Sequence, residues 1–128
     1  WEMFQLLSSI RFMDLIIYFP LHLIKRFSEA NKGLYKIDRF FGTDNWRILY
    51  EETKADGYRY FDRKFIDFFY RQLGTLNYKQ FKCSEPLMSN TKNSPLYRLI
   101  YASKHKLGYD FWNISTKKDA SGQLKFDL

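Results

Sequence analysis

The sequence predicts an α/β protein, and three observations carry that prediction. An apolar, β-rich run at 13–19 lies between helical patterns at 1–10 and 21–31, and helix, buried strand and helix in this order are the rhythm of a βαβ architecture. The middle of the chain, about 34–76, is helical. Two further strand candidates follow with no helix between them, so we expect them to pair antiparallel. No linker divides the chain into two domains.

The strand predicted at 13–19 reads Met-Asp-Leu-Ile-Ile-Tyr-Phe. A continuous apolar run, rather than an alternating one, is typical of a strand buried on both faces of a parallel sheet. Pro20 cannot extend a ladder and marks the end of the strand. The helix that follows is expected to stop at Gly33. In the helix before the strand, apolar residues recur at spacings that line one face: Met3, Phe4, Leu7 and Ile10.

The helical middle is divided by its glycines. A short helix at 37–41 stops at Gly42, and Thr43 or Asp44 is expected to cap the next one, because each offers a side-chain oxygen to free backbone N–H groups. The helix at 61–76 has the clearest pattern. Its apolar side chains form one stripe: Phe61, Phe65, Phe68, Phe69, Leu73 and Leu76.

The two late strand candidates are 78–84 and 96–103. The connector between them is rich in Pro, Ser and Asn, which favour turns. A last short helix is predicted at 107–113. The tail, 117–128, is polar, with one further strand candidate at 124–126.

Composition limits the classes of function. The chain has 21 Lys and Arg against 14 Asp and Glu, and its net charge of +7 suits contact with a polyanion such as nucleic acid, or a solvated basic surface. Aromatic residues make up 20%, which fits a Phe-rich core with Tyr at its margin, or base stacking and interfaces. The one cysteine, Cys83, excludes an internal disulfide and favours a reducing, cytoplasmic environment. The longest apolar stretch, 13–24, is too short and interrupted to span a membrane, and no signal peptide is recognisable.

Patterns that carry chemistry are missing from the sequence. The glycines lie too far apart for a dinucleotide fingerprint or a P-loop, and neither His22 nor His105 has a partner at metal-ligand spacing. Most carboxylates stand beside Lys or Arg, as on solvated helix faces. The sequence therefore offers no catalytic residue, no cofactor site and no metal site.

Three segments remain as candidate binding sites for substrate or nucleic acid. The first is the end of the predicted strand, Tyr18 and Phe19, together with Arg26 on the next helix. In open α/β sheets, ligands bind beyond the carboxyl ends of the strands. Packing of the two rings, with an exposed arginine beside them, explains the segment equally well.

The other two segments combine cations with rings. Arg39 and Arg47 flank an aromatic cluster that contains Trp46, and such a group can grip phosphate and stack a base. Rings wedged into a helix junction are the favoured alternative. Lys104 and His105 stand after the last strand and just before a helix, where an anion can bind. A plain basic turn is the favoured alternative there.

These pieces together resemble a known family. The specific parts are Phe-Phe-Gly-Thr-Asp-Asn-Trp-Arg at 40–47 and Leu-Tyr-Arg-Leu-Ile-Tyr-Ala-Ser-Lys-His at 96–105, preceded by the strand and proline at 13–20. They resemble the C-terminal half of the three-Cys-motif partner proteins, a bacterial and phage family with a fold like that of class I S-adenosylmethionine-dependent methyltransferases. The similarity covers 1–112, in patches.

The resemblance implies a frame for the chain. Residues 13–19 would be the fifth strand of a seven-stranded Rossmann-like sheet, the two late strands its final antiparallel pair, and 34–76 a helical insertion. The methyltransferase-like portion would span 1–116, followed by the polar tail. The parent protein's S-adenosylmethionine would be held by strands upstream of Trp1, so no cofactor-binding or catalytic residue falls within this segment.

The sequence thus predicts the C-terminal region of a methyltransferase-like protein, which supplies a surface for substrate or partner, with nucleic acid as the favoured ligand. A three-cysteine-motif protein is a further expected partner, and self-association is expected for the isolated segment, because its sheet would have an open edge. Two alternatives are a non-catalytic, basic and aromatic module that binds nucleic acid, and a structural domain for protein interaction.

Overall fold

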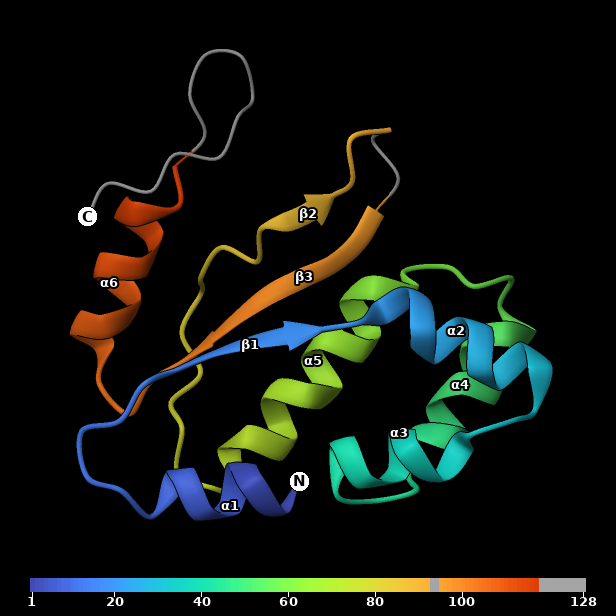
Figure 1. Cartoon of the computed structure of the whole chain (residues 1–128), viewed down its shortest axis with the longest axis horizontal. Coiled ribbons are helices and arrows are strands. Elements are labelled where there is room, and N and C mark those ends of the chain that lie inside the picture. The colour runs from blue at the N-terminus through green and yellow to red at the C-terminus, as the bar shows by residue number, and fades with distance from the viewer. Residues whose placement is uncertain (93–94, 118–128) are drawn as a thin grey trace.

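The computed structural model describes residues 1–92 and 95–117. Helices and a small antiparallel sheet form a mixed α/β fold, with the sheet between α6 on one side and the remaining helices on the other (Figure 1). Along the chain the elements are α1 (Glu2–Ser8), β1 (Leu15–Phe19), α2 (Leu21–Ala30), α3 (Leu34–Phe41), α4 (Trp46–Ala55), α5 (Phe61–Gly74), β2 (Leu87–Ser89), β3 (Pro95–Ala102) and α6 (Lys106–Ser115).

The sheet has the order β1-β3-β2, and β3 is antiparallel to both neighbours. Within the described residues β1 is therefore not the parallel strand that the sequence predicts. Nor is β1 buried on both faces, because its side chains are alternately buried and exposed. Ile16 and Tyr18 are 62% and 49% exposed. The unbroken apolar run misleads because its outward residues are as apolar as its inward ones.

The prediction of a strand at 78–84 is wrong, and the strand β2 forms instead within the segment that was predicted to be a connector. The segment 78–84 is extended, but its backbone groups are bound mainly by side chains of α6. The N–H of Ser84 donates to the Asn113 side chain at 2.8 Å, and Trp112 Nε1 donates to the Ser84 carbonyl at 2.7 Å. One backbone hydrogen bond, from Lys79 to Ser103 at 2.8 Å, joins the segment to the chain just beyond β3.

The helix predictions are confirmed, with small shifts at the ends. Asn31, and not Gly33, closes α2 in a left-handed conformation, whereas Gly33 begins α3. Gly42 ends α3 at φ 73°, as its position predicts. The N-cap of α4 is Asn45, without a side-chain hydrogen bond, so the predicted caps at Thr43 and Asp44 are wrong.

Phenylalanines fill the core between the sheet and the helices. Phe19, on the inward face of β1, stacks on Phe69 of α5 at 5.0 Å, and Phe40 of α3 stacks on the same ring at 5.0 Å. Phe41 meets Phe68 edge to face at 5.1 Å. A Phe-rich core is therefore confirmed, and it fixes α3 and α5 against the inward face of β1.

A smaller cluster lies on the outward face of the sheet. The Tyr101 ring of β3 stacks on Trp112 of α6 at 5.2 Å and meets Tyr109 edge to face. Helix α6 thus covers one end of this face. None of the described helices has both the length and the apolar composition that a membrane crossing requires. The tail at 118–128, with the strand candidate 124–126, lies outside the described residues.

Candidate functional site

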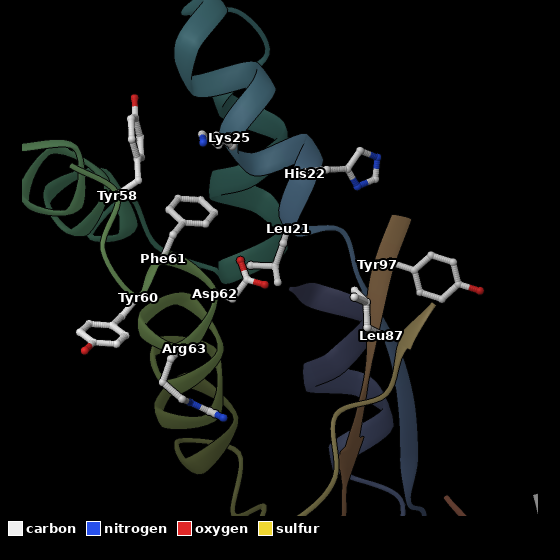
Figure 2. Close-up of a pocket in the computed structure, with 10 residues that line it drawn as sticks. All are labelled: Leu21, His22, Lys25, Tyr58, Tyr60, Phe61, Asp62, Arg63, Leu87 and Tyr97. Atoms are coloured by element: carbon white, nitrogen blue, oxygen red, sulfur yellow. The ribbon is translucent and has the colours of Figure 1, made fainter. Parts of the chain in front are cut away.

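A cleft of about 550 Å³ opens where β1 ends and α2 begins (Figure 2). Its walls are the first turns of α2 and α5, the loop before α5, and the sheet residues Leu87 and Tyr97. In Figure 2, Leu21, Phe61 and Asp62 point into the space between α2, α5 and the sheet. The full lining is Leu21, His22, Lys25, Tyr58, Tyr60, Phe61, Asp62, Arg63, Leu87 and Tyr97.

The loop that forms one wall of the cleft has an unusual backbone. Gly57, Tyr58 and Tyr60 all have positive φ, at 68°, 61° and 56°. A tyrosine in this left-handed region is uncommon, and each such residue costs on the order of 1–2 kcal/mol. Packing of the Tyr60 ring offsets little of this cost, because the residue is 70% exposed. Conformations of this kind cluster at ligand-binding sites, where exposed side chains must be aimed.

Two cations on the cleft wall, Lys25 and Arg63, differ in whether they are bound in ion pairs. The Lys25 ammonium lies over the Tyr58 ring, 4.3 Å from its centre, and takes part in none of the ion pairs among the described residues. The Arg63 guanidinium is paired with both Asp67 and Glu85, at 2.8 and 3.3 Å. Lys25 is therefore the cation that a ligand in the cleft would meet first.

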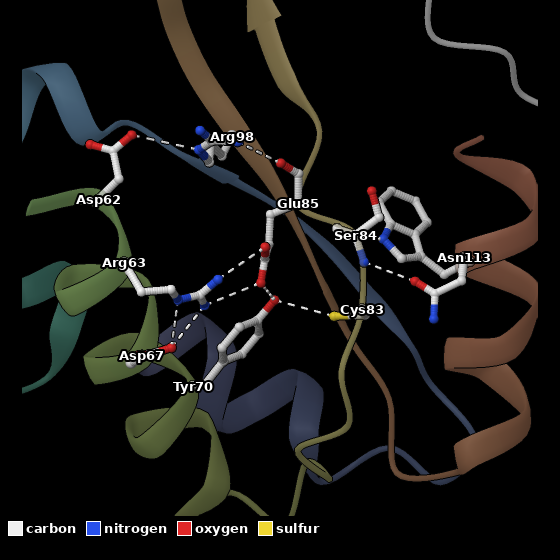
Figure 3. Close-up of polar contacts among 10 residues, drawn as sticks. Asp62, Arg63, Asp67, Tyr70, Cys83, Ser84, Glu85, Arg98 and Asn113 are labelled. Carbon is white, nitrogen blue, oxygen red and sulfur yellow. Dashed lines mark hydrogen bonds and ion pairs between the residues drawn. The ribbon is translucent and has the colours of Figure 1, made fainter. Parts of the chain in front are cut away.

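Beneath the cleft, Arg63 belongs to a polar network that ties α5 to the segment before β2 (Figure 3). The Tyr70 hydroxyl donates to Glu85 at 2.9 Å and lies 3.3 Å from the Cys83 sulfur. Burial, with the nearby Cys83 and Glu85, raises the pKa of Tyr70. Burial also raises the pKa of the Cys83 thiol, which therefore stays protonated and unreactive near neutrality. The network fixes the cleft wall and offers no nucleophile.

Two of the sequence-predicted residues, Trp46 and Arg47, meet at the α3–α4 junction. Trp46 is 1% exposed, and its Nε1 donates to Asp38 at 2.7 Å. Arg47 forms a two-point pair with the same carboxylate, at 3.1 and 2.5 Å. Arg39 is exposed on α3. Asp38 therefore accepts the hydrogen bonds of both Trp46 and Arg47 within the junction. The Trp46 ring is buried and has no free face for a base.

The remaining predicted residues lie elsewhere. The Lys104 ammonium donates to the Ser8 carbonyl at the end of α1 and lies 5.4 Å from the centre of the Tyr78 ring. His105 is exposed and stacks on Phe12 at 6.2 Å. Arg26 is exposed on α2, next to Lys25 but outside the cleft lining.

Apart from Trp46 and Arg47, which share Asp38, the structure therefore does not bring the predicted residues together. Lys104 and the α3–α4 junction lie at opposite ends of α1 (Figure 1). In the sequence, the predicted residues are alike because each lies in a segment that combines cations with aromatic rings. In the structure they do not form one common site.

The sequence prediction missed the loop residues Tyr58 and Tyr60 and the cation Lys25. A usable signal was present, because Asp-Gly at 56–57 marks a turn, and the Tyr-Arg-Tyr that follows places two large rings where loops are exposed. The predicted location, beyond the carboxyl end of the first strand, coincides with the cleft, although Tyr18 and Phe19 are not in its lining.

Among the residues described, no group of three or more His, Cys, Asp or Glu side chains is placed to hold a metal ion. Comparison with family models, with curated proteins and with solved structures finds no match to this chain.

Proposed function

We propose that this chain supplies a nucleic-acid-binding surface, and that a single-stranded segment lies in the cleft between α2, α5 and the sheet. The observation that carries the proposal is the cleft wall itself: an exposed Tyr60 on a strained loop, with the Lys25 ammonium beside Tyr58. Tyrosine rings stack on any base, and an ammonium contacts phosphate without regard to sequence.

Size and charge support the proposal. The cleft volume of about 550 Å³ falls in the range of roughly 300–1,000 Å³ that is usual for ligand sites. The net charge of +7 favours a polyanion over an acidic protein surface of small area. One acidic side chain, Asp62, lies in the lining, and its carboxylate is 3.6 Å from Arg98. That pair reduces the repulsion which Asp62 alone would exert on phosphate.

We further propose that the chain is the substrate-side region of a class I methyltransferase-like protein, as the resemblance to the three-Cys-motif partner family implies. In that frame β1 is the fifth strand, and the last strand, β3, is antiparallel to its neighbours, as in the final pair that the resemblance implies. In a doubly wound sheet the fourth strand would lie beside the fifth, at the edge of β1 that no described strand pairs with. The proposed cofactor, S-adenosylmethionine, would be bound by the parent protein and not by these residues.

Binding is tested with a fluorescent single-stranded oligonucleotide of mixed sequence. We expect the affinity to fall steeply as salt rises, because phosphate contacts release counterions. Tyr60→Asn removes the ring while keeping a residue that tolerates the left-handed backbone, and Lys25→Gln removes the charge. The loss of one stacked base weakens binding by about 1–3 kcal/mol.

Each variant has a matched control in the same chain. Tyr35→Asn removes a tyrosine that is 60% exposed on α3, and Lys36→Gln removes a lysine whose ammonium also lies near a ring, that of Phe27 at 5.9 Å. Both controls should bind as the unchanged protein does. Equal losses in the cleft variants and the controls, or binding that is flat with salt, would show that the cleft is not the site.

The methyltransferase frame has a separate test. The coding sequence upstream of Trp1 should encode a glycine-rich turn after a strand and, later, an Asp-Pro motif. An upstream region that lacks both contradicts the frame and leaves the cleft proposal standing as a binding module.

A further inference from the structure

Among the described residues that line the cleft, Asp62 is the acidic one. It lies in the first turn of α5, where the helix dipole stabilises a carboxylate. Figure 2 shows it pointing into the space between α2, α5 and the sheet, and its side chain is 53% exposed. In the part of the chain that the structure describes, its contact is an ion pair rather than a hydrogen bond, so the carboxylate can still accept from a ligand.

The carboxylate is held at the cleft by Arg98 of β3 (Figure 3). Arg98 Nε lies 3.6 Å from Asp62 Oδ2, which is too long for a hydrogen bond but close enough for an ion pair. The same guanidinium donates from Nη1 to the Glu85 carbonyl at 2.9 Å, so the backbone before β2 fixes its place. Asp62 is therefore positioned by Arg98 while its oxygens keep most of their capacity to accept.

The walls around this carboxylate are apolar. Leu21 and Phe61 are 7% and 8% exposed, and Leu87 lines the sheet side of the same space. An apolar site with one fixed polar group admits a planar ring and orients it through that group. A carboxylate that faced phosphate would only weaken the binding of a polyanion, whereas one that meets donors on a base edge adds discrimination between bases.

We propose that Asp62 selects guanine among the bases of the bound single strand. Because this role requires a single strand in the cleft, it rests on the proposed function. The Watson–Crick edge of guanine carries N1–H and the N2 amino group side by side, and one carboxylate can accept from both.

The other bases fit a carboxylate less well. Adenine and cytosine each place a ring nitrogen that accepts beside their amino group, and thymine and uracil flank their single N–H with carbonyl oxygens. Each of them would set an acceptor against an oxygen of Asp62. Tyr60 and Lys25 contact any nucleotide, so the base preference is assigned to Asp62 and the overall affinity to the ring and the ammonium.

The test compares short oligothymidines that carry a single central guanine, hypoxanthine, adenine or cytosine. Each is titrated with the 128-residue chain at low salt, and binding is followed by fluorescence anisotropy. We expect the guanine oligonucleotide to bind more tightly than the adenine one by about fivefold or more, as a two-point base contact gives. Hypoxanthine keeps N1–H and lacks the amino group, so its affinity should fall between the two.

Asp62→Asn replaces a group that only accepts with one that accepts and donates, the pattern that suits adenine or cytosine. The preference for guanine over adenine should vanish or reverse. The matched control is Asp56→Asn, because the Asp56 side chain is 55% exposed, lies 3.6 Å from the Lys64 ammonium, and is outside the cleft lining. Both variants remove one negative charge and should raise the affinity for every oligonucleotide alike. The affinity ratio should change in Asp62→Asn and stay constant in Asp56→Asn.

The ratio also separates recognition from folding, since a partly unfolded variant loses affinity for all four oligonucleotides equally. Equal affinities of the unchanged protein for the four overturn the selection of guanine and leave the cleft proposal standing. A guanine preference that survives Asp62→Asn overturns the role of Asp62. If none of the four binds at low salt, the proposed function fails, and the role of Asp62 fails with it.

Discussion

Two regions of this molecule each combine an aromatic ring with a cation, but they differ in whether a ligand can reach these side chains. The α3–α4 junction combines Trp46 with Arg47, and the cleft combines Tyr60 with Lys25. At the junction a single carboxylate, Asp38, accepts from both the indole and the guanidinium. In the cleft Tyr60 is exposed, and the described partner of Lys25 is a ring.

The difference shows that a nearby carboxylate, by bonding to a cation and a ring, decides whether they are free to bind a ligand. Asp38 stands one helix before Trp46 and turns a pair that resembles a base-stacking site into a fixed helix junction. Beneath the cleft, the acidic residues Asp67 and Glu85 bind Arg63, whereas none of the ion pairs among the described residues includes Lys25. A ligand can therefore compete for the cleft and not for the junction.

The largest expected effect is at the junction. Trp46→Ala removes a fully buried ring, and we expect it to lower the free energy of unfolding by about 3–5 kcal/mol. Urea unfolding followed by circular dichroism measures the loss. If the variant keeps its stability and instead loses affinity for an oligonucleotide, the junction is a binding site and the comparison is reversed.

A smaller loss is expected for Asp38→Ala, which leaves the buried Trp46 N–H without its acceptor. An unpaired buried donor costs about 1–3 kcal/mol, whereas the exposed part of the Arg47 pair adds little. Asp38→Asn keeps an acceptor oxygen for the indole and should lose much less. Equal losses in the two variants would mean that the charge of Asp38, rather than its hydrogen bond to Trp46, holds the junction together.

The support of the cleft wall is tested through Tyr70. Tyr70→Phe removes the hydrogen bond to Glu85 and should cost about 0.5–1.5 kcal/mol at neutral pH. Because burial raises the pKa of Tyr70 above its ordinary value of 10.0, its neutral form contributes stability that is complete below pH 10 and declines as the pH rises further. The unfolding free energies of the two proteins should therefore converge above pH 10. A constant difference between them there would show that Tyr70 ionises normally in the folded protein.

The smallest expected effect on stability is at the cleft loop, and its sign is favourable. Tyr60→Gly relieves the left-handed backbone and removes a ring that packs little, so we expect the free energy of unfolding to stay level or to rise by up to about 1 kcal/mol. Oligonucleotide affinity should fall in the same variant. Tyr35→Gly within α3 is the control, and it should lose about 1 kcal/mol, as glycine does in a helix. A loss of stability in Tyr60→Gly would mean that the ring supports the fold.

Local patterns predicted the helices well, because the spacing of residues such as Phe61, Phe65 and Phe69 is decided within a few turns. Whether a segment forms a strand, and which of its faces is buried, depends on partners that are distant in the sequence. Nothing within 13–19 indicates that only one face is covered, since that depends on where α6 packs. The segment 78–84 looks like a strand but is held by Asn113 and Trp112.

The candidate site was predicted only in its location, at the end of the first strand. Its main ring, Tyr60, is placed by a backbone conformation that residue type alone rarely indicates. The junction was overestimated because Asp38, eight positions before Trp46, becomes its partner only once α3 and α4 have folded against each other.

The position of β3 has a consequence for how the chain folds. The strand at the centre of the sheet is the last of the described strands along the chain, and Asp14 and Tyr101, which bond at its end, are 87 positions apart. During synthesis β1 therefore has no described partner until β3 has left the ribosome, whereas helices α2 to α5 can pack early through local contacts. We expect a helical intermediate with an unpaired β1, so that the rate of sheet closure sets how long the apolar strand is exposed to other chains.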